Sequence, residues 1–400
     1  MENTWIQDAI ERIQEKMDWV SDKHKNAIPY TTDKNGNYDD RSDSSDWGYM
    51  NGLDWWTNGF WGGLMWLLYQ QTNQQKYADY ANISETKLSK TLQTFYGLHH
   101  DVGFMFQTTA IANYRLTGNV NSRLLGLHAA NLLAGRFNLQ GGFIRAWNSE
   151  DDRKSQAPSV KPETQDWSPF GDDIRGWAII DCMMNISTLY WASAETKDPR
   201  FFHIATKHAQ TAAKYFVRDD GSVNHIIEID PFTGEFVKTY AGQGYNKDSS
   251  WSRGQAWALY GFANTYKNTK DPEFLNTAKK IAHYCIANIR SDGLVPLDFR
   301  QPLQPELEDS AGACIIASGL LEIADVVPEY EKAIYKNSAI KILKAIYDLR
   351  SDWTKDNDSI VKNCSSAYHD TAGHHMRMVY ADYFFVEAIY KLKDIGIYMW

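Results

Sequence analysis

One aspartate stands in a stretch of sequence that is otherwise apolar. Asp181 lies within the run GWAIIDCMMN, residues 176–185, which holds no other charged residue. Burial of a carboxylate is costly and raises its pKa, so such a group can keep a proton near neutral pH and act as a general acid. The structural alternative is an aspartate that caps a neighbouring helix or pairs with an arginine in the core. If the run is helical, one face carries Trp177, Asp181, Met184, Thr188 and Trp191.

A second aspartate, Asp101, follows His99 and His100 and precedes the apolar run that begins at Val102. Its plainest role is to cap a helix that begins at residue 102, because a carboxylate accepts hydrogen bonds from the free N–H groups of a first helical turn. In a ring of helices, a carboxylate at a helix start also faces the mouth of the cavity, where it can accept hydrogen bonds from sugar hydroxyls. Both interpretations stay open on the sequence alone.

The segment 243–257 gathers a glutamine, two tryptophans and an arginine around the start of a predicted helix. Arg253 is suited to a bidentate contact with a carboxylate, and Trp251 and Trp257 offer faces on which a sugar ring can stack. The alternatives are a place in the core for Trp257 and an internal aspartate as the partner of Arg253. A second aromatic group occurs at residues 55–61, where one tryptophan is expected in the core.

Other chemistries fit this sequence badly. It contains no HExxH motif, no P-loop, no GxSxG turn and no GxGxxG after a strand. The histidines of the pairs 99–100 and 374–375 are adjacent, and neighbours on a helix do not face one site, so we expect no metal and no cofactor. With 41 basic and 50 acidic side chains, a net charge of −9 and no basic block, nucleic acids and anionic membranes are poor partners. What remains is general acid–base catalysis by carboxylates on a polar ligand.

A mostly helical chain must position these side chains, because strand signals are scarce and segments of helical period follow one another. Alternate segments differ in character: those near 57, 102, 175, 253, 309 and 378 are apolar on nearly every side, whereas the others are charged on one face. This alternation predicts inner and outer layers of helices. The segments are 4–20, 57–71, 76–95, 102–117, 121–136, 175–195, 199–217, 253–268, 271–288, 309–325, 329–349 and 378–392.

The junctions between helices also repeat, as the sequence TKDP at residues 196–199 and 269–272 illustrates. Asp-Pro ends one helix and starts the next, since proline fits the first helical turn and restricts the residue before it. A repeat of helix pairs forms an open solenoid or a closed ring. Six inner and six outer helices favour an all-α (α/α)6 toroid, which we expect to form one domain over residues 1–400. An irregular helical bundle is the alternative.

Three segments interrupt the helical pattern and are expected to decorate one rim of the ring: 28–56, 146–174 and 218–252. The third contains an alternating stretch that begins at Ser222 and ends at a Pro-x-Thr-Gly turn, which predicts a small β-hairpin. Long loops in a compact domain are usually functional.

Cysteine usage predicts a reducing compartment, because the four cysteines are far apart and form neither a CxxC pair nor a disulfide framework. The first twenty residues read as a charged amphipathic helix rather than a signal peptide. The apolar run 61–69 is far shorter than the roughly 20 residues of a membrane span. We therefore expect a cytoplasmic protein.

Several motifs, in order along nearly the whole chain, resemble the unsaturated glucuronyl hydrolases of glycoside hydrolase family 88. The resemblance implies a cytoplasmic (α/α)6 enzyme that removes the 4,5-unsaturated uronic acid that lyases leave at the non-reducing end of glycosaminoglycan fragments. The motifs are WTNGFW (56–61), HHDVGF (99–104), IIDCMMN (179–185), SRGQAW (252–257), YGF (260–262), DSAGA (309–313), GLLEIA (319–324) and DY (382–383).

The resemblance also implies roles for individual residues. It places Asp181 at the acid/base position, where it donates a proton to C4 of the enol ether and activates the water that adds at C5. It places Asp101 at the second carboxylate position, where it holds ring hydroxyls. Residues that match the sugar pocket are Trp56, His100, Trp147, His225, Gln243, Trp251, Arg253, Trp257 and Tyr368.

Two segments depart from the family pattern, the long stretch 146–174 and the loop 364–377. Both bear on the second sugar and hence on substrate preference. His374, His375 and Arg377 of that loop are candidates for contact with a sulfate, and the alternative is that they are solvated. Related interpretations of the chain are an unsaturated rhamnogalacturonyl hydrolase and a non-hydrolytic toroid that binds or isomerises sugars.

Overall fold

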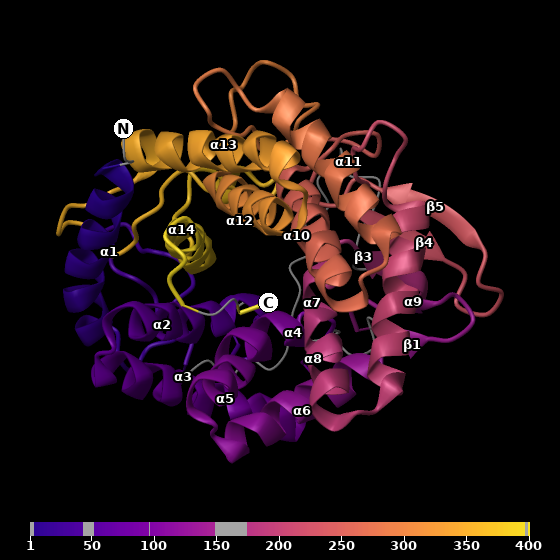
Figure 1. Ribbon diagram of the computed structural model, residues 1–400, viewed down its shortest axis with the longest axis horizontal. Coiled ribbons are helices and arrows are strands. Elements are labelled where there is room, and N and C mark those ends of the chain that lie inside the picture. Colours follow the sequence, from indigo (N-terminus) through magenta and orange to yellow (C-terminus); the bar gives the residue numbers. More distant parts are fainter. Residues whose placement is uncertain (1–3, 43–51, 96, 149–173, 397–398) are drawn as a thin grey trace.

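The structure, a computed structural model, describes residues 4–42, 52–95, 97–148, 174–396 and 399–400. Within these residues the helices form two concentric layers around a central axis (Figure 1). The inner layer is buried on nearly every side because its helices are apolar all round. Its members are α2 (Gly59–Thr72), α4 (Val102–Phe106), α5 (Ala112–Thr117), α7 (Cys182–Asn185), α8 (Ser187–Thr196), α10 (Ser252–Thr269), α12 (Ser310–Val326) and α14 (Val379–Lys391).

The outer layer buries one face of each helix against the inner one. Asp198 and Asp271 cap two of its helices, each accepting a backbone N–H two residues on, with proline in the first turn as the repeated Asp-Pro junction predicts. Contacts run from α2 to α4, α7, α10, α12, α14 and back to α2, so the ring closes and the predicted (α/α)6 toroid is confirmed. The outer helices are α1 (Thr4–Lys23), α3 (Gln75–Thr94), α6 (Val120–Ala134), α9 (Pro199–Tyr215), α11 (Pro272–Asn288) and α13 (Glu329–Ala345).

Two of the predicted inner helices are not continuous. The segment expected as one helix over 175–195 begins instead as a short 3-10 turn, η4 (Ile174–Gly176), and a strand, followed by α7 and α8. The segment 102–117 is interrupted by the π-helical turn η2 (Gln107–Ile111). Further short turns are η1 (Trp56–Asn58), η5 (Ile346–Arg350) and η6 (Thr371–Gly373).

A small antiparallel sheet stands on the right-hand rim in Figure 1. It contains the predicted hairpin, β4 (Ile226–Ile229) and β5 (Phe236–Tyr240), and this prediction is confirmed. Its third strand, β3 (Trp177–Ile179), was not predicted, and it pairs with β4 so that Ile179 faces Ile226. A separate two-stranded ladder joins β1 (Phe137–Asn138) to β2 (Phe143–Ile144).

The end of the chain lies at the centre of the ring (Figure 1). Trp400 is 7% exposed and packs on Phe60, Phe104 and Phe384 of three inner helices. The backbone oxygen of Met399 accepts hydrogen bonds from Gln107 Nε2 (2.7 Å) and Arg115 Nη1 (2.9 Å). The last two residues therefore fill the core of the toroid.

The predicted rim segments are only partly described. Residues 149–173, most of the segment 146–174, and residues 43–51 of the segment 28–56 lie outside the described residues.

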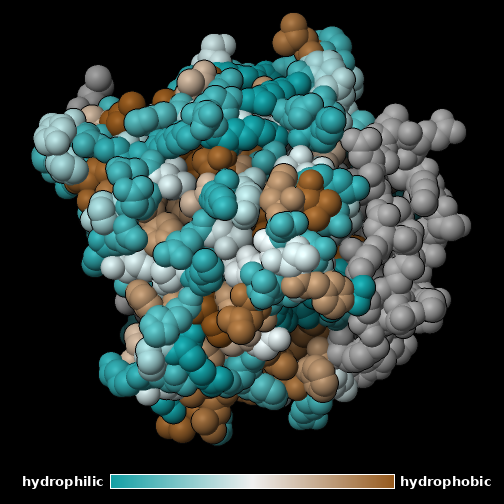
Figure 2. All heavy atoms as spheres, turned by 90° about the vertical axis from the view of Figure 1, so that its right-hand side faces the viewer, coloured by the Kyte–Doolittle hydropathy of each residue, from teal (hydrophilic) through white to brown (hydrophobic). Residues whose placement is uncertain are grey.

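The face on the side of α9 and the hairpin is mainly polar, with apolar side chains in small groups (Figure 2). Within the described ranges, no helix combines the length and the hydrophobicity needed to cross a lipid bilayer.

Candidate active site

Asp181 is positioned by the end of β3. The backbone N–H of Ile180 donates to the carbonyl oxygen of His225 (3.1 Å), which continues the β3–β4 pairing to the residue before Asp181. The carboxylate oxygen Oδ1 then lies 4.0 Å from His225 Nε2. The expected helical stripe with Trp177 is wrong, because Trp177 lies in a strand and α7 begins only at Cys182.

The Asp181 side chain is 16% exposed, and its Oδ1 atom has no hydrogen-bond partner among the described residues. Although Asp181 precedes α7, its side chain does not cap that helix. Burial raises the pKa of Asp181 to about 7, against the lowering effect of the more distant Arg253 charge. Neither structural alternative, a helix cap or a paired core aspartate, describes this residue.

Asp101 occupies the N-cap position of α4, but its side chain makes no capping hydrogen bond. The capping alternative is therefore wrong. Instead, Oδ1 of Asp101 accepts a hydrogen bond from Asn185 Nδ2 (2.9 Å). Burial, followed by the negative charge of Asp181, raises the pKa of Asp101 well above its ordinary value. Two buried acids of this kind share protons as a pair, so at neutral pH the pair keeps a proton.

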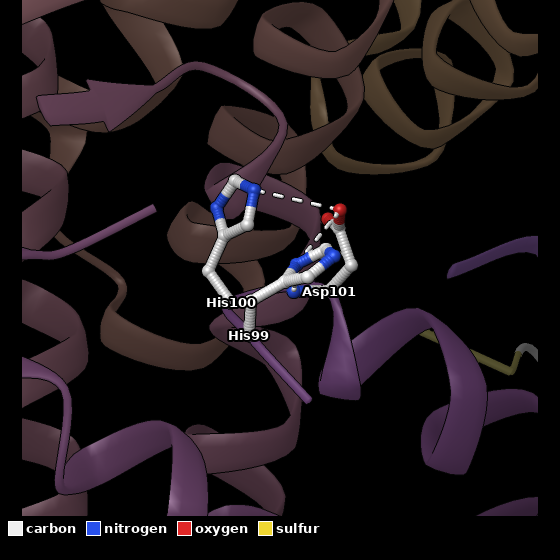
Figure 3. Close-up of side chains that lie close together, drawn as sticks. All are labelled: His99, His100 and Asp101. Carbon is white, nitrogen blue, oxygen red and sulfur yellow. Dashed lines mark hydrogen bonds and ion pairs between the residues drawn. The ribbon is translucent and has the colours of Figure 1, made fainter. Parts of the chain in front are cut away.

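His99 and His100 both face the Asp101 carboxylate (Figure 3). His99 Nδ1 and His100 Nε2 each lie 3.5 Å from Asp101 Oδ2. The expectation that the two histidines cannot face one site is wrong, because they lie in a turn before α4 and not on a helix. Burial and neighbouring positive groups lower the pKa of His100 well below its ordinary value, so this ring is neutral.

The same three residues are the described group whose donor atoms are close enough to hold a metal ion, with all three atoms within 4.8 Å of one another. Nitrogen and carboxylate ligands suit zinc and other transition-metal ions. The absence of a metal requirement therefore stays a prediction, which depletion with a chelator tests.

His225 is held by a loop that passes very close to its ring. Gln243 donates its backbone N–H to His225 Nδ1 (2.9 Å), so the ring proton lies on Nε2, on the side of Asp181. A Cβ atom at Gly242, where φ is +58°, would lie 1.8 Å from His225 Nδ1, and glycine is therefore required there. Burial lowers the pKa of His225 to about 3, so His225 is a neutral hydrogen-bond donor.

Arg253 is buried, with only 1% of its surface exposed. Its Nη1 donates to Asp309 Oδ2 (2.9 Å) and to the carbonyl oxygen of Ser365, and its Nη2 donates to that of Ser366. The alternative, pairing with an internal aspartate, is what the structure shows. The guanidinium also stacks on Trp251, 4.7 Å from the ring centre, so Arg253 joins α10, α12 and the loop after residue 364 behind the site.

That loop in turn holds Gln243 and Tyr368. Gln243 Nε2 donates to Ser366 O (2.6 Å), and the Tyr368 N–H donates to Gln243 O (2.9 Å). The Tyr368 ring packs edge-on against Tyr245, with ring centres 4.9 Å apart. Both predicted residues are half-buried and belong to one connected rim segment.

The predicted tryptophans have different environments. Trp257 is completely buried against Phe104 (4.8 Å between ring centres). The alternative, that Trp257 is a core residue, is therefore confirmed. Trp56 is half-buried and packs on Tyr380. Trp251 packs on the His225 ring (4.4 Å), and Trp147 lies beside Trp177 of β3 (6.2 Å).

Three polar residues that position the site had no predicted role. Asn185 holds Asp101, Asp309 holds Arg253, and the buried Asp298 accepts hydrogen bonds from Ser249 Oγ (2.6 Å) and from the N–H groups of Tyr245 and Ser250. Asp298 thereby fixes the loop that leads to Trp251. The one usable signal was a polar residue, Asn185 or Asp309, next to a long apolar run.

Comparison with known proteins identifies the family of this chain. The family model described as Glycosyl Hydrolase Family 88 matches residues 13–397. The chain is 32% identical over 360 residues to an unsaturated glucuronyl hydrolase of Bacillus sp. (strain GL1), covering 88% of this chain and 90% of that protein. It is 30% identical over 350 residues to an unsaturated chondroitin disaccharide hydrolase of Streptococcus pyogenes serotype M1, covering 86% and 82%.

The fold agrees as well. A solved structure of an unsaturated glucuronyl hydrolase variant with dGlcA-Glc-Rha-Glc superposes with a TM-score of 0.84 at 29% identity, covering 97% of this chain and 96% of that one. The residues matched by the family model include both aspartates. The chain belongs to glycosyl hydrolase family 88.

Proposed function

We propose that this enzyme releases the 4,5-unsaturated uronic acid from the non-reducing end of lyase-generated glycosaminoglycan oligosaccharides. The observation that carries the proposal is a set of buried polar atoms around Asp181 that have no hydrogen-bond partner among the described residues. Each would gain a partner from a polar ligand, and a buried polar atom without one is costly. They are Asp181 Oδ1, His225 Nε2, His100 Nε2 and Trp251 Nε1.

In the proposed reaction, Asp181 donates its proton to C4 of the C4=C5 enol ether, and a water molecule adds at C5. The resulting carboxylate of Asp181 accepts the proton of that water, so the residue returns to its starting state. The hemiketal at C5 then opens the ring, and the aglycone leaves without direct displacement at the anomeric carbon. A pKa of about 7 suits a group that both donates and accepts a proton near neutral pH.

Asp101 in this scheme accepts hydrogen bonds from ring hydroxyls. Its Oδ2 is the oxygen that Asn185 does not engage, and it faces His99 and His100. His225, a neutral donor whose Nε2 lies 4.0 Å from Asp181 Oδ1, would orient the sugar or the water. We assign no catalytic role to Arg253, because Asp309 and two backbone carbonyls already bind its terminal nitrogens.

The relatives support this class of substrate: one is named for chondroitin disaccharides, and another is solved with dGlcA-Glc-Rha-Glc. With a net charge of −9, long-range attraction of an anionic substrate is not available, so recognition depends on short-range hydrogen bonds and stacking. We also infer a reducing, cytoplasmic location, because all four cysteines are unpaired and buried.

The test is the ultraviolet absorbance of the conjugated double bond. Unsaturated disaccharides from chondroitin, hyaluronan and heparin, and one from rhamnogalacturonan, are each incubated with the enzyme. We expect absorbance to fall with at least one glycosaminoglycan disaccharide. Activity with the rhamnogalacturonan disaccharide alone, or binding with no loss of absorbance, would contradict the proposal.

A further inference from the structure

The start of α4 is capped by a residue from another helix. Asp101 holds the position from which a side chain normally caps, yet the N–H of Phe104 donates instead to Oδ1 of Asn185 in α7 (2.6 Å). Because an acceptor is supplied from outside, the Asp101 carboxylate is not used by its own helix. It is therefore available to the site.

The Asn185 amide also donates. Its Nδ2 lies 2.9 Å from Asp101 Oδ1 and 3.2 Å from the backbone oxygen of Asp181. Asn185 has no exposed surface, and a Cβ atom at Gly103 would lie 2.6 Å from its Oδ1, so the two helices meet directly on this amide. One side chain thus contacts the segments that carry both carboxylates.

We propose that Asn185 is a positioning residue for the reaction, which caps α4 in place of Asp101 and orients the Asp101 carboxylate through the hydrogen bond to Oδ1, so that Oδ2 is left for the substrate. The inference rests on the proposed function. An amide is the side chain that does both, because it accepts through Oδ1 and donates through Nδ2. An aspartate would accept the Phe104 N–H but has nothing to donate to Asp101.

The hydrogen bonding of Asp101 agrees with this role. The Asn185 hydrogen bond lowers the pKa of Asp101, against the larger raising effects of burial and of the Asp181 charge. Within the described residues, Asn185 Nδ2 is the donor at ordinary hydrogen-bond distance from the Asp101 carboxylate. Titratable groups that face Asp101 from its own turn and from adjacent elements are His99, His100, Asp181, Cys182 and Arg136.

Two substitutions separate the cap from the donor. Asn185→Asp keeps an acceptor for the Phe104 N–H and loses the donor, whereas Asn185→Ala loses both. We expect each to lower kcat by about 10- to 100-fold, the effect of one hydrogen bond to a charged group, with a smaller change in KM. We also expect the pH–rate profile to move, because the Asn185 hydrogen bond lowers the pKa of Asp101 and each variant removes that hydrogen bond.

The matched control is Asn113→Asp. Asn113 is also a buried amide that donates to a buried carboxylate, Glu85 Oε2 (2.8 Å), but it lies in α5, outside the site. Its variant should lose stability while kcat and the pH profile of the folded enzyme stay unchanged. This isolates the effect on Asp101 from the general effect of losing a buried amide.

The wild-type assay distinguishes a failure of the proposed function from a failure of the proposed role of Asn185. Wild-type enzyme inactive on every unsaturated disaccharide overturns the proposed function. Wild-type activity with Asn185→Asp unchanged in kcat and pH profile overturns the role of Asn185, including the case in which only Asn185→Ala is impaired, because Asn185 would then be a cap alone. If Asn185→Ala does not fold, Asn185→Asp decides, since it keeps the cap.

Discussion

Two groups of buried acids lie on the inner helices, and they differ in what surrounds them. At the site, Asp101 and Asp181 have raised pKa values and no ion pair with lysine or arginine in the described structure. In the second group, Glu322 of α12 binds Lys391 Nζ (2.5 Å) and also Lys267, and Glu387 of α14 lies 3.8 Å from Lys391.

The charges explain the difference in protonation. Two lysines lower the pKa of Glu322 despite its complete burial, so this carboxylate is ionised and holds α10, α12 and α14 together. Near Asp181 the nearest comparable cation, Arg253, is already paired with Asp309. Glu322, with two lysines, is a structural ion-pair partner, whereas Asp181, with no lysine or arginine partner among the described residues, has a raised pKa and can keep a proton.

The largest effect that separates the two groups is expected for Asp181→Asn. The amide keeps the shape of the side chain but has no proton to exchange, so kcat should fall by at least the 10²- to 10⁴-fold that general acid–base catalysis typically contributes. Substrate binding, measured by calorimetry, should persist. Asp271→Asn, the same change at the cap of outer helix α11, is the control and should leave kcat unchanged. Near wild-type kcat in Asp181→Asn would refute the mechanism.

The free energy of unfolding should change in opposite directions when the acid of each group is replaced by its amide. Glu322→Gln leaves Lys391 and Lys267 without their buried partner and should cost about 3–5 kcal/mol of unfolding free energy. The same change at the exposed residue Glu329, which pairs with Lys332, should leave the unfolding free energy nearly unchanged. Equal losses in the two variants would show that the Glu322 group is not a structural ion-pair network. Chemical unfolding at pH 7 measures both.

Asp181→Asn should instead stabilise the fold at alkaline pH. The folded-state pKa of about 7 lies above the ordinary value of 3.8, so the folded protein binds this proton more tightly than the unfolded chain does. The contribution of Asp181 to stability is therefore present at low pH and is lost as the pH rises through 7. At pH 8 the variant should be more stable by up to about 4 kcal/mol. A variant less stable than wild type at that pH would contradict a raised pKa.

A smaller effect is expected at the divergent loop. Arg377 binds Asp352 (2.7 Å) rather than open solvent, and His374 Nε2 contacts the carbonyl oxygens of Ala367 and Tyr368. Arg377→Ala should therefore raise KM only a few-fold, and equally for sulfated and unsulfated disaccharides. A several-fold larger rise for the sulfated substrate alone would place Arg377 at the sulfate.

No effect is expected from metal removal. The Asp101 carboxylate binds hydroxyls in the proposed mechanism, and no step uses a metal. Dialysis against a chelator should leave kcat unchanged. A loss of activity that one divalent ion restores would assign His99, His100 and Asp101 as its ligands.

Sequence patterns predicted the ring well because its determinants are local. The Asp-Pro junctions cap α9 and α11 as expected, and uniformly apolar segments became inner helices. The exception was the segment 175–195, where the pairing of β3 with β4 overrides helical period. A short buried strand and a buried helix share the same apolar composition, so only the distant partner strand decides between them.

At the site, residue types were easier to predict than their partners. Asp181 was identifiable from its isolation in an apolar run, but the pairing of Arg253 with Asp309 joins residues 56 positions apart. Asn185 was hard to predict for the same reason, since its role depends on a contact with Asp101, 84 positions away. Such contacts depend on how inner helices meet at the centre of the ring.

The most direct test of the account is the protonation state of Asp181 itself. Infrared difference spectra of the wild type and Asp181→Asn, recorded between pH 5 and 9, detect the protonated carboxyl group. We predict a carboxylic acid signal that is present at pH 6, disappears with a midpoint near pH 7 and is absent from the variant. A wild-type signal already lost by pH 5, or one that survives unchanged in Asp181→Asn, would contradict the role of Asp181 as the proton donor.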